Sequence, residues 1–318
     1  MAENRKTKLS RTFTYGTEVL NIDNNIAITT VSGSISGFAA TIAKQPIQRI
    51  KWIRQVHEGP SIPYKQIVKN TVDTLGTRGF FAGSMASIYR NVPHSMLAFS
   101  VYPIAENFMF YQVEGHPLNE KKSSRTFSTR FWAGYLTLFF TTLITHPLDT
   151  LRVRLSVHSD AATLGAFRTS AHIWKHEGFS SFYRGFGATL LGAGPRGAIG
   201  FGIFESLKPI LDKVEGLDDY KVGTRFFAGY TAGFMSEFFI YPLDTIRRRQ
   251  QALGDATCIS RQNVLEALRH IFRTEGVRGM FKGISLNLVK NPLATGVSFL
   301  VNDHVKEALG YVPHGPQD

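Results

Sequence analysis

The sequence of 318 residues holds a single cysteine, Cys258. An intramolecular disulfide needs two cysteines and a cysteine-rich metal site needs more, so both are excluded. Acidic residues are also few, because 24 Asp and Glu stand against 36 Lys and Arg, which gives a formal net charge of +12. This excess favours an anionic partner, which by charge alone is equally a nucleic acid, an anionic lipid or a small anion.

Motifs of catalysis are lacking as well. The sequence has no glycine-rich loop followed by Lys-Ser/Thr, no HExxH and no GxSxG. Catalysis needs an acid and a base paired beside a pocket, and the acids of this chain fit a different role, so we expect no enzyme activity, no metal and no cofactor. A soluble nucleic-acid-binding protein would use the positive charge but would not need the near-uncharged stretches described next, so we expect no nucleic-acid partner.

Long hydrophobic runs are scarce, and the mean hydropathy of −0.07 is that of a soluble protein. The average hides an alternation of apolar and very polar stretches. Three stretches are nearly free of charge and only slightly shorter than the ~20 residues of a membrane-spanning helix: Ile26–Ala43, Phe131–Thr145 and Phe226–Tyr241. Three more are apolar with isolated polar residues: Ser84–Tyr111, Phe186–Lys208 and Ile284–Lys306. We therefore expect six spans, against the alternative of a soluble all-α protein. Small residues four apart, as at Gly33 and Gly37, favour helices packed in lipid.

A threefold repeat organises the chain. The segments "QPIQRIKWIR", "HPLDTLRVR" and "YPLDTIRRR" place Pro46, Pro147 and Pro242 about a hundred residues apart. After each comes an amphipathic stretch, at Tyr64–Leu75, Thr163–Lys175 and Arg261–Phe272, and then a turn between two glycines, at Gly76–Gly83, Gly178–Gly185 and Gly276–Gly283. We expect an all-α fold with an N-terminal tail over 1–24 and repeats over 25–115, 124–213 and 221–310. Within the tail, we expect Met1–Arg11 to be unstructured, and the alternative is a weak organelle-targeting segment.

The charges after each proline predict a gate. Proline kinks a helix, and three kinks at matching positions would bring three helix ends toward one axis. An acid two residues after the proline and a base three residues beyond it share one helix face. With threefold pseudosymmetry, each acid meets the base of the next repeat. The predicted pairs are Asp149 with Arg247, Asp244 with Lys51, and Gln48 with Arg152, the last limited to a hydrogen bond because Gln48 is not acidic.

The pattern Pro-x-[Asp/Glu]-x-x-[Lys/Arg], present three times with a glycine-rich turn after each copy, resembles the mitochondrial carrier family from about Ile26 to Leu309. The resemblance implies six tilted transmembrane helices and three short matrix helices. It also implies alternating access across the inner mitochondrial membrane, with both termini toward the intermembrane space. We further expect contact with membrane lipids, cardiolipin among them, and function as a monomer.

Two further family features can be placed on this chain. The motif of the family's cytoplasmic gate, an acid followed three residues later by a base, is matched by Glu205 and Lys208 and by Asp303 and Lys306, whereas the first repeat carries Glu106 in place of the base. Across the gate, Glu205 would pair with Lys306. Asp303 would then face Glu106, so we predict a weak cytoplasmic gate. The family also places a glutamine nine residues after the motif proline as a brace across the ion pair. Gln55 and Gln251 match this position and Ser156 does not.

Candidate substrate contacts follow from the same resemblance. Seven residues after the closing glycine of each turn stand Arg90, Gly192 and Lys290, which match the family's contact points. Arg90 and Lys290 would hold phosphates, while Gly192 and Ala193 would leave room for a base. Arg196 lies one turn further on the same face and counts as a third cation. The alternative is that these bases serve interhelical hydrogen bonds or reach the lipid headgroups.

Glu237 is an acid inside an apolar stretch, "GFMSEFFIY". It could accept from an adenine amino group, pair with Arg196, carry a coupled proton or bond to a neighbouring helix. Since "LNLVKNPLATGVSF" at Leu286–Phe299 resembles coenzyme A carriers, we expect exchange of coenzyme A or a related adenine nucleotide. An ADP/ATP-type or other nucleotide carrier, or a non-nucleotide anion carrier of the same family, is the alternative.

Overall fold

A computed structural model describes residues 3–114, 127–211, 221–253, 259 and 262–310. In these ranges every regular element is a helix and no strand is present. The chain divides into two compact units, one formed by Gln45–Lys290 and the other by Met1–Lys44 with Asn291–Asp318. Helices α1 (Glu3–Val56) and α9 (Ser285–Ala308) each contribute to both units.

The smaller unit differs from the sequence-based expectation at its N-terminus. Helix α1 begins at Glu3, so the segment Met1–Arg11 is helical over its described part rather than unstructured. The physical reason is the absence of a helix breaker, because no proline precedes Pro46. The proposed repeat boundary after residue 24 therefore falls within a continuous helix.

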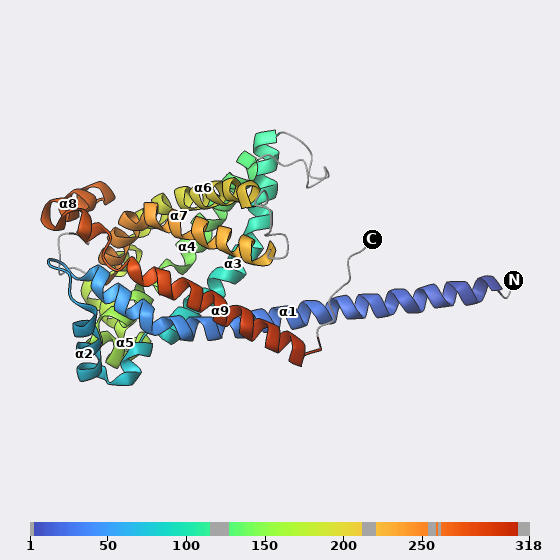
Figure 1. Ribbon diagram of the computed structural model, residues 1–318, viewed down its shortest axis with the longest axis horizontal. Helices are drawn as coiled ribbons and strands as arrows, with labels where there is room; N and C mark the ends of the chain where they lie inside the picture. Colours follow the sequence, from blue (N-terminus) through green and yellow to red (C-terminus); the bar gives the residue numbers. More distant parts are fainter. Residues whose placement is uncertain (1–2, 115–126, 212–220, 254–258, 260–261, 311–318) are drawn as a thin grey trace. The chain divides into compact units, whose positions relative to one another are not determined.

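The larger unit contains the three predicted amphipathic stretches and four long helices (Figure 1). α3 packs along α4, and α6 packs along α7, so neighbouring repeats meet through consecutive long helices. Short 3₁₀ turns lie between the glycines of the first two repeats. The elements are α2 (Tyr64–Leu75), η1 (Thr77–Phe81), α3 (Ser84–Glu114), α4 (Phe127–Val157), α5 (Ser159–Glu177), η3 (Phe179–Tyr183), α6 (Phe186–Leu211), α7 (Lys221–Ala252) and α8 (Val264–Met280).

The three motif prolines lie inside helices, Pro46 in α1, Pro147 in α4 and Pro242 in α7. Beyond the prolines, the C-terminal ends of these helices converge. Trp52 and Val56 of α1, Val153 of α4 and Ala252 of α7 form one buried hydrophobic cluster. The predicted convergence of the three motif segments is thus present within the larger unit.

Glycine is required at both ends of the turns that follow. All six of the predicted outer glycines have a φ between +66° and +83°, a region that residues with a side chain rarely adopt. Gly185 is also a close contact point, because a Cβ built there would lie 2.9 Å from the backbone oxygen of Arg247. The glycine spacing read from the sequence therefore marks where each turn presses against a motif helix.

The residue before each motif proline ties its helix to the turn of the same repeat. Gln45 Nε2 donates to the Ala82 carbonyl at 2.8 Å, and the Tyr241 hydroxyl donates to the Lys282 carbonyl at 2.8 Å. His146 Nδ1 lies 2.9 Å from the Phe182 carbonyl, which makes Nδ1 the protonated nitrogen. Three different side chains therefore form the same hydrogen bond between helix and turn. Because the residue types differ, the sequence does not reveal that the three positions have the same role. These residues are Gln45, His146 and Tyr241.

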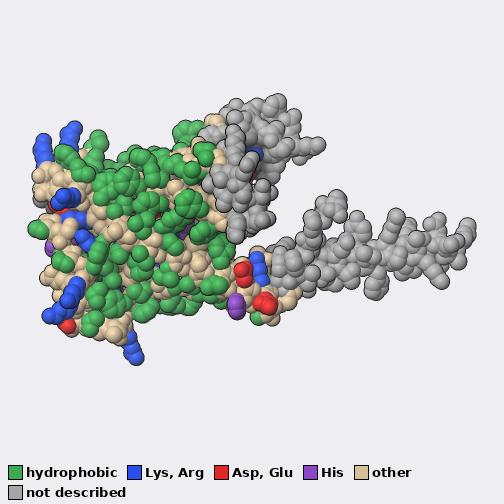
Figure 2. All heavy atoms as spheres, in the orientation of Figure 1, with side chains coloured by type: hydrophobic (Ala, Val, Ile, Leu, Met, Phe, Trp, Pro, Cys, Tyr) green, Lys and Arg blue, Asp and Glu red, His purple; other side chains and the backbone are tan. Residues whose placement is uncertain are grey.

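The surface separates apolar from charged side chains. Figure 2 shows hydrophobic side chains over the long helices, and Lys and Arg side chains gathered at the end that carries α2, α5 and α8. Large side chains such as Phe99 of α3 and Phe227 of α7 are exposed. Taken singly, no described helix is both long enough and apolar enough to be a candidate membrane span. Helices α8 and α9, which are bent by 57° at their junction, are long and apolar enough when taken together.

Candidate functional site

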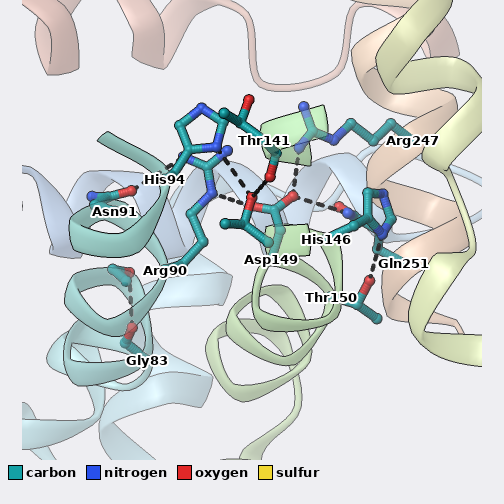
Figure 3. Close-up of polar contacts among 12 residues, drawn as sticks. Gly83, Arg90, Asn91, His94, Thr141, His146, Asp149, Thr150, Arg247 and Gln251 are labelled. Atoms are coloured by element: carbon teal, nitrogen blue, oxygen red, sulfur yellow. Dashed lines mark hydrogen bonds and ion pairs between the residues drawn. The ribbon is translucent and has the colours of Figure 1, made fainter. Parts of the chain in front are cut away.

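Asp149 of α4 has ion pairs with three arginines in the described part of the chain, and Figure 3 shows two of them, Arg90 and Arg247. Its Oδ2 accepts hydrogen bonds from Arg247 Nη2 at 2.5 Å, Gln251 Nε2 at 2.9 Å and Arg248 Nη1 at 3.3 Å, all on α7. Its Oδ1 lies 3.5 Å from Arg90 Nε on α3. One buried carboxylate thus holds three guanidinium groups and joins α3, α4 and α7.

Asp244 of α7 forms the second predicted pair. Its Oδ2 lies 3.6 Å from Lys51 Nζ and accepts a hydrogen bond from Gln55 Nε2 at 3.4 Å. Its Oδ1 lies 3.8 Å from Arg248 Nε. The predicted braces are both in contact with the predicted acids, Gln251 with Asp149 and Gln55 with Asp244. A buried pair of this kind is costly to break, because the remaining charge has no water to solvate it.

The third pair is not formed. Gln48 and Arg152 are both buried, but within the described residues no hydrogen bond joins them. The guanidinium of Arg152 instead lies over the Trp52 ring, 4.9 Å from its centroid, and Arg248 lies 4.8 Å from the same centroid. The amide of Gln48 does not attract the cation as a carboxylate would, so the favourable contact available to Arg152 is with the aromatic face.

The predicted substrate contacts are placed differently from one another. Arg90 is partly buried and bound to Asp149, Lys290 is partly exposed on α9, and Arg196 is exposed with no ion pair among the described residues. A Cβ built on Gly192 would lie 3.0 Å from a methyl carbon of Ile240 on α7. The space that we expected beside Gly192 and the partly buried Ala193 is therefore filled at Gly192 by α7, and this glycine lets α6 and α7 approach closely.

Glu237 forms an interhelical bond. Its Oε1 accepts a hydrogen bond from Asn287 Nδ2 of α9 at 2.8 Å and lies 3.6 Å from Lys51 Nζ of α1. Of the alternatives open from the sequence, pairing with Arg196 is absent in this conformation, and the bond to a neighbouring helix is present. Because Lys51 also contacts Asp244, Glu237 belongs to the same charged network as the second gate pair.

The predicted cytoplasmic gate draws on both units. Glu106 is buried and Glu205 is exposed in the larger unit, while the side chain of Lys208 lies outside the described part of the structure. Asp303 is exposed and Lys306 partly exposed in the smaller unit. The contacts across this gate stay a prediction.

Sequence reasoning missed a second set of ion pairs. Arg154 of α4 binds the Glu177 carboxylate at the end of α5 with both terminal nitrogens, one of them at 2.8 Å, and Arg184 reaches the same carboxylate at 3.2 Å. Burial alone would raise the pKa of Glu177, but the Arg154 hydrogen bonds hold it below its ordinary value. Arg154 Nε also donates to the Gln251 carbonyl at 2.9 Å, which links the second repeat to the third.

The third repeat contains the equivalent arrangement. Arg249 of α7 donates two 2.8 Å hydrogen bonds to Glu275, and Lys282 Nζ lies 2.5 Å from Glu275 Oε2. Burial would raise the pKa of Glu275, but these cationic donors lower it to about 2. Arg249 Nε donates to the Gln55 carbonyl at 3.1 Å, and Lys282 donates to the His57 carbonyl at 3.0 Å, so the third repeat is linked to the first.

The first repeat lacks this arrangement altogether. At the positions of the first base, the acid and the second base, the first repeat has uncharged residues, which are Ile53, Leu75 and Ala82. The signal was present in the sequence, because each base lies seven residues after a motif proline and each glutamate directly precedes the first glycine of the turn. The gate pairs, and the hydrogen bonds from Arg154 and Arg249 to backbone carbonyls, therefore connect repeat two to three and three to one. The junction of repeats one and two has neither kind of contact at the corresponding positions.

A family model described as "Mitochondrial carrier protein" matches residues 23–113, 123–215 and 218–312. The chain belongs to the mitochondrial carrier family, and the prediction of an all-α fold in three repeats is confirmed. Among its relatives is "Mitochondrial coenzyme A transporter SLC25A42" of Homo sapiens, 32% identical over 288 residues that cover 89% of this chain and 88% of that protein.

A second relative is "Mitochondrial adenine nucleotide transporter ADNT1" of Arabidopsis thaliana, 31% identical over 304 residues that cover 88% of this chain and 86% of that protein. The "Calcium-binding mitochondrial carrier protein SCaMC-2-A" of Danio rerio is 26% identical over 284 residues, which cover 88% of this chain and 59% of that protein. These relatives are named as carriers and transporters, and the chain is a carrier rather than an enzyme.

Proposed function

We propose that this carrier exchanges coenzyme A or a closely related adenine nucleotide across the inner mitochondrial membrane. The observation that carries the proposal is the group of three arginines, Arg90, Arg247 and Arg248, around the single carboxylate of Asp149. An excess of buried cations favours an anionic ligand. The choice of nucleotide rests on the similarity to carriers named for coenzyme A and for adenine nucleotides.

The proposed mechanism is alternating access. The pairs of Asp149 with Arg247 and Asp244 with Lys51 hold the matrix ends of α1, α4 and α7 together, and Gln251 and Gln55 brace them. A substrate phosphate that binds Arg90 competes with Asp149 for the same guanidinium. Binding then weakens the matrix gate in exchange for a new charge-assisted contact, which lets that gate open with substrate bound.

The proposed topology has six long helices that cross the membrane, with α2, α5 and α8 on the matrix side. Both termini face the intermembrane space, and a gate formed by Glu106, Glu205, Lys208, Asp303 and Lys306 closes the cytoplasmic side. Exposed apolar side chains on the long helices, such as Phe99 and Phe227, favour contact with lipid, cardiolipin included. A single chain supplies both gates, so the carrier works as a monomer.

Reconstitution into liposomes tests the function. Vesicles loaded with unlabelled nucleotide are given labelled coenzyme A, adenosine 3′,5′-bisphosphate, ADP, ATP or a dicarboxylate outside, and uptake is compared with that of empty vesicles. We expect uptake of coenzyme A or the bisphosphate that depends on the internal nucleotide. Preference for ADP and ATP would favour the adenine nucleotide alternative, and uptake of the dicarboxylate alone would overturn the proposal.

A further inference from the structure

The cationic cluster at the matrix gate is not balanced by its own acids. Contacts join Lys51, Arg90, Arg152, Arg247 and Arg248 into one group through Asp149, Asp244 and Trp52. Even with Glu237, which lies 3.6 Å from Lys51, five positive charges meet three carboxylates. Uncompensated charge is costly away from water, so a cluster of this kind is completed by an anion.

Arg152 is where the imbalance is concentrated. It is 8% exposed, it forms no hydrogen bond or ion pair among the described residues, and its Nε is buried without an acceptor. Arg247 and Lys51, at the equivalent positions of the other repeats, each have an aspartate as partner. The equivalent partner here is Gln48, which is neutral. The Trp52 face stabilises a cation less than a carboxylate does, and it is shared with Arg248.

We propose that Arg152 and Arg248, beside Trp52, form a second binding site for a phosphate group, next to the contact assigned to Arg90 and Lys290, with Asp149 between Arg248 and Arg90. This inference rests on the proposed function and deepens it. A substrate with phosphates at two separated positions, such as a nucleotide phosphorylated at both its 3′ and 5′ oxygens, would engage both sites. The phosphate takes the place that a carboxylate at residue 48 would fill, and a guanidinium matches it through paired N–H donors.

The test uses thermal unfolding of the full-length purified carrier with three probes. These are adenosine 3′,5′-bisphosphate, adenosine 5′-monophosphate and inorganic phosphate. We expect the bisphosphate to raise the unfolding temperature of the wild type more than the monophosphate does, because it occupies both sites. If inorganic phosphate, added by itself, also raises the unfolding temperature, the site binds free phosphate as well as a phosphate ester.

The variant Gln48→Glu supplies the missing carboxylate from the chain itself. We expect it to abolish the advantage of the bisphosphate over the monophosphate, and any response to inorganic phosphate, while the response to the monophosphate stays. Gln66→Glu, which adds the same charge on the exposed face of α2, is the matched control and is expected to behave as wild type. A second variant, Arg152→Gln, removes the cation and is expected to lose the same difference.

The outcomes separate this inference from the proposed function. Equal responses of the wild type to the bisphosphate and monophosphate, or an unchanged difference in Gln48→Glu, would overturn the second phosphate site and leave nucleotide binding intact. No response of the wild type to either nucleotide, together with failed nucleotide uptake in liposomes, would overturn the proposed function itself.

Discussion

Arg90 connects the proposed substrate contact with the gate, because its Nε lies 3.5 Å from Asp149 Oδ1. We chose Arg90 as a substrate contact because it lies seven residues after the closing glycine of its turn. This spacing does not predict which residues its side chain contacts. The same reasoning placed Lys290 and Gly192. Only the packed structure separates them, since Gly192 faces Ile240 of the next helix.

Replacing either cation is expected to weaken transport. We predict that Arg90→Ala and Lys290→Ala each lower nucleotide uptake in liposomes at least ~10-fold, because a charge-assisted contact contributes ~1.5–3 kcal/mol. Arg130→Ala, at an exposed position near the start of α4, is the control and is expected to transport normally. The substitutions should also reduce the rise in unfolding temperature that the nucleotide causes. Normal uptake by both variants would refute the assigned contacts.

The ion pairs around Glu275 join one helix to the next. Glu275→Gln leaves Arg249 and Lys282 without their acid, and we expect it to destabilise the carrier by about 3 kcal/mol, as for other broken buried pairs. Thermal unfolding of the variant measures this loss. Glu58→Gln, an exposed glutamate on the loop after α1, is the matched control. An unfolding temperature equal to that of wild type would show that the pair contributes nothing.

The pH dependence of the same variant follows from the pKa. Glu275 has a pKa of about 2 in the folded carrier, below its ordinary value of 4.5. Its contribution is therefore fully present above pH 4.5 and is lost as the pH falls from there toward 2, since the unfolded chain takes up the proton first. We expect the difference in unfolding temperature between wild type and Glu275→Gln to be constant from pH 7 to 5 and to narrow below 4.5. A constant difference down to pH 3 would contradict this origin.

At the scale of the element, the turns are the part most fully predictable from sequence. The spacing of Gly178 and Gly185 predicted a turn, and both have a positive φ. Gly185→Ala combines an unfavourable φ with a Cβ 2.9 Å from the Arg247 carbonyl, so we expect a loss of ~2 kcal/mol or more in thermal stability. Gly134→Ala in α4, where nothing lies within 4 Å of the added Cβ, is the control and should change stability little. Equal effects of the two substitutions would rule out the close contact.

The elements also show where prediction from the sequence ends. The proline motifs and the amphipathic stretches predicted the helices, because hydrophobic periodicity can be read within a short segment of sequence. The tie made by Gln45, His146 and Tyr241 could not be predicted, because an amide, an imidazole and a phenol perform the same bond. We expected a hydrogen bond between Gln48 and Arg152, but the Arg152 guanidinium lies over the Trp52 ring. The prediction paired acids with bases and did not consider aromatic partners.

For the whole molecule, the junctions between repeats are unequal. Asp149 with Arg247 and Arg154 with the Gln251 carbonyl link repeats two and three, while Asp244 with Lys51 links three and one. The junction of repeats one and two lacks both contacts at the corresponding positions, where Gln48 and Ile53 stand, and the ion pair described there is that of Arg90 with Asp149, which a substrate phosphate bound to Arg90 would release. We infer that the matrix end opens first at this junction.

A third ion pair should therefore stiffen the molecule. We predict that Gln48→Glu raises the unfolding temperature of the ligand-free carrier, since it gives the buried Arg152 an acid. It should also slow exchange about tenfold, which corresponds to ~1.4 kcal/mol of added barrier to opening the matrix gate. Exchange is measured with ADP, which has no 3′-phosphate, so that loss of the second phosphate site does not contribute. Gln66→Glu serves again as the control. If the variant unfolds and exchanges as wild type does, the junction of repeats one and two is not the one that limits opening.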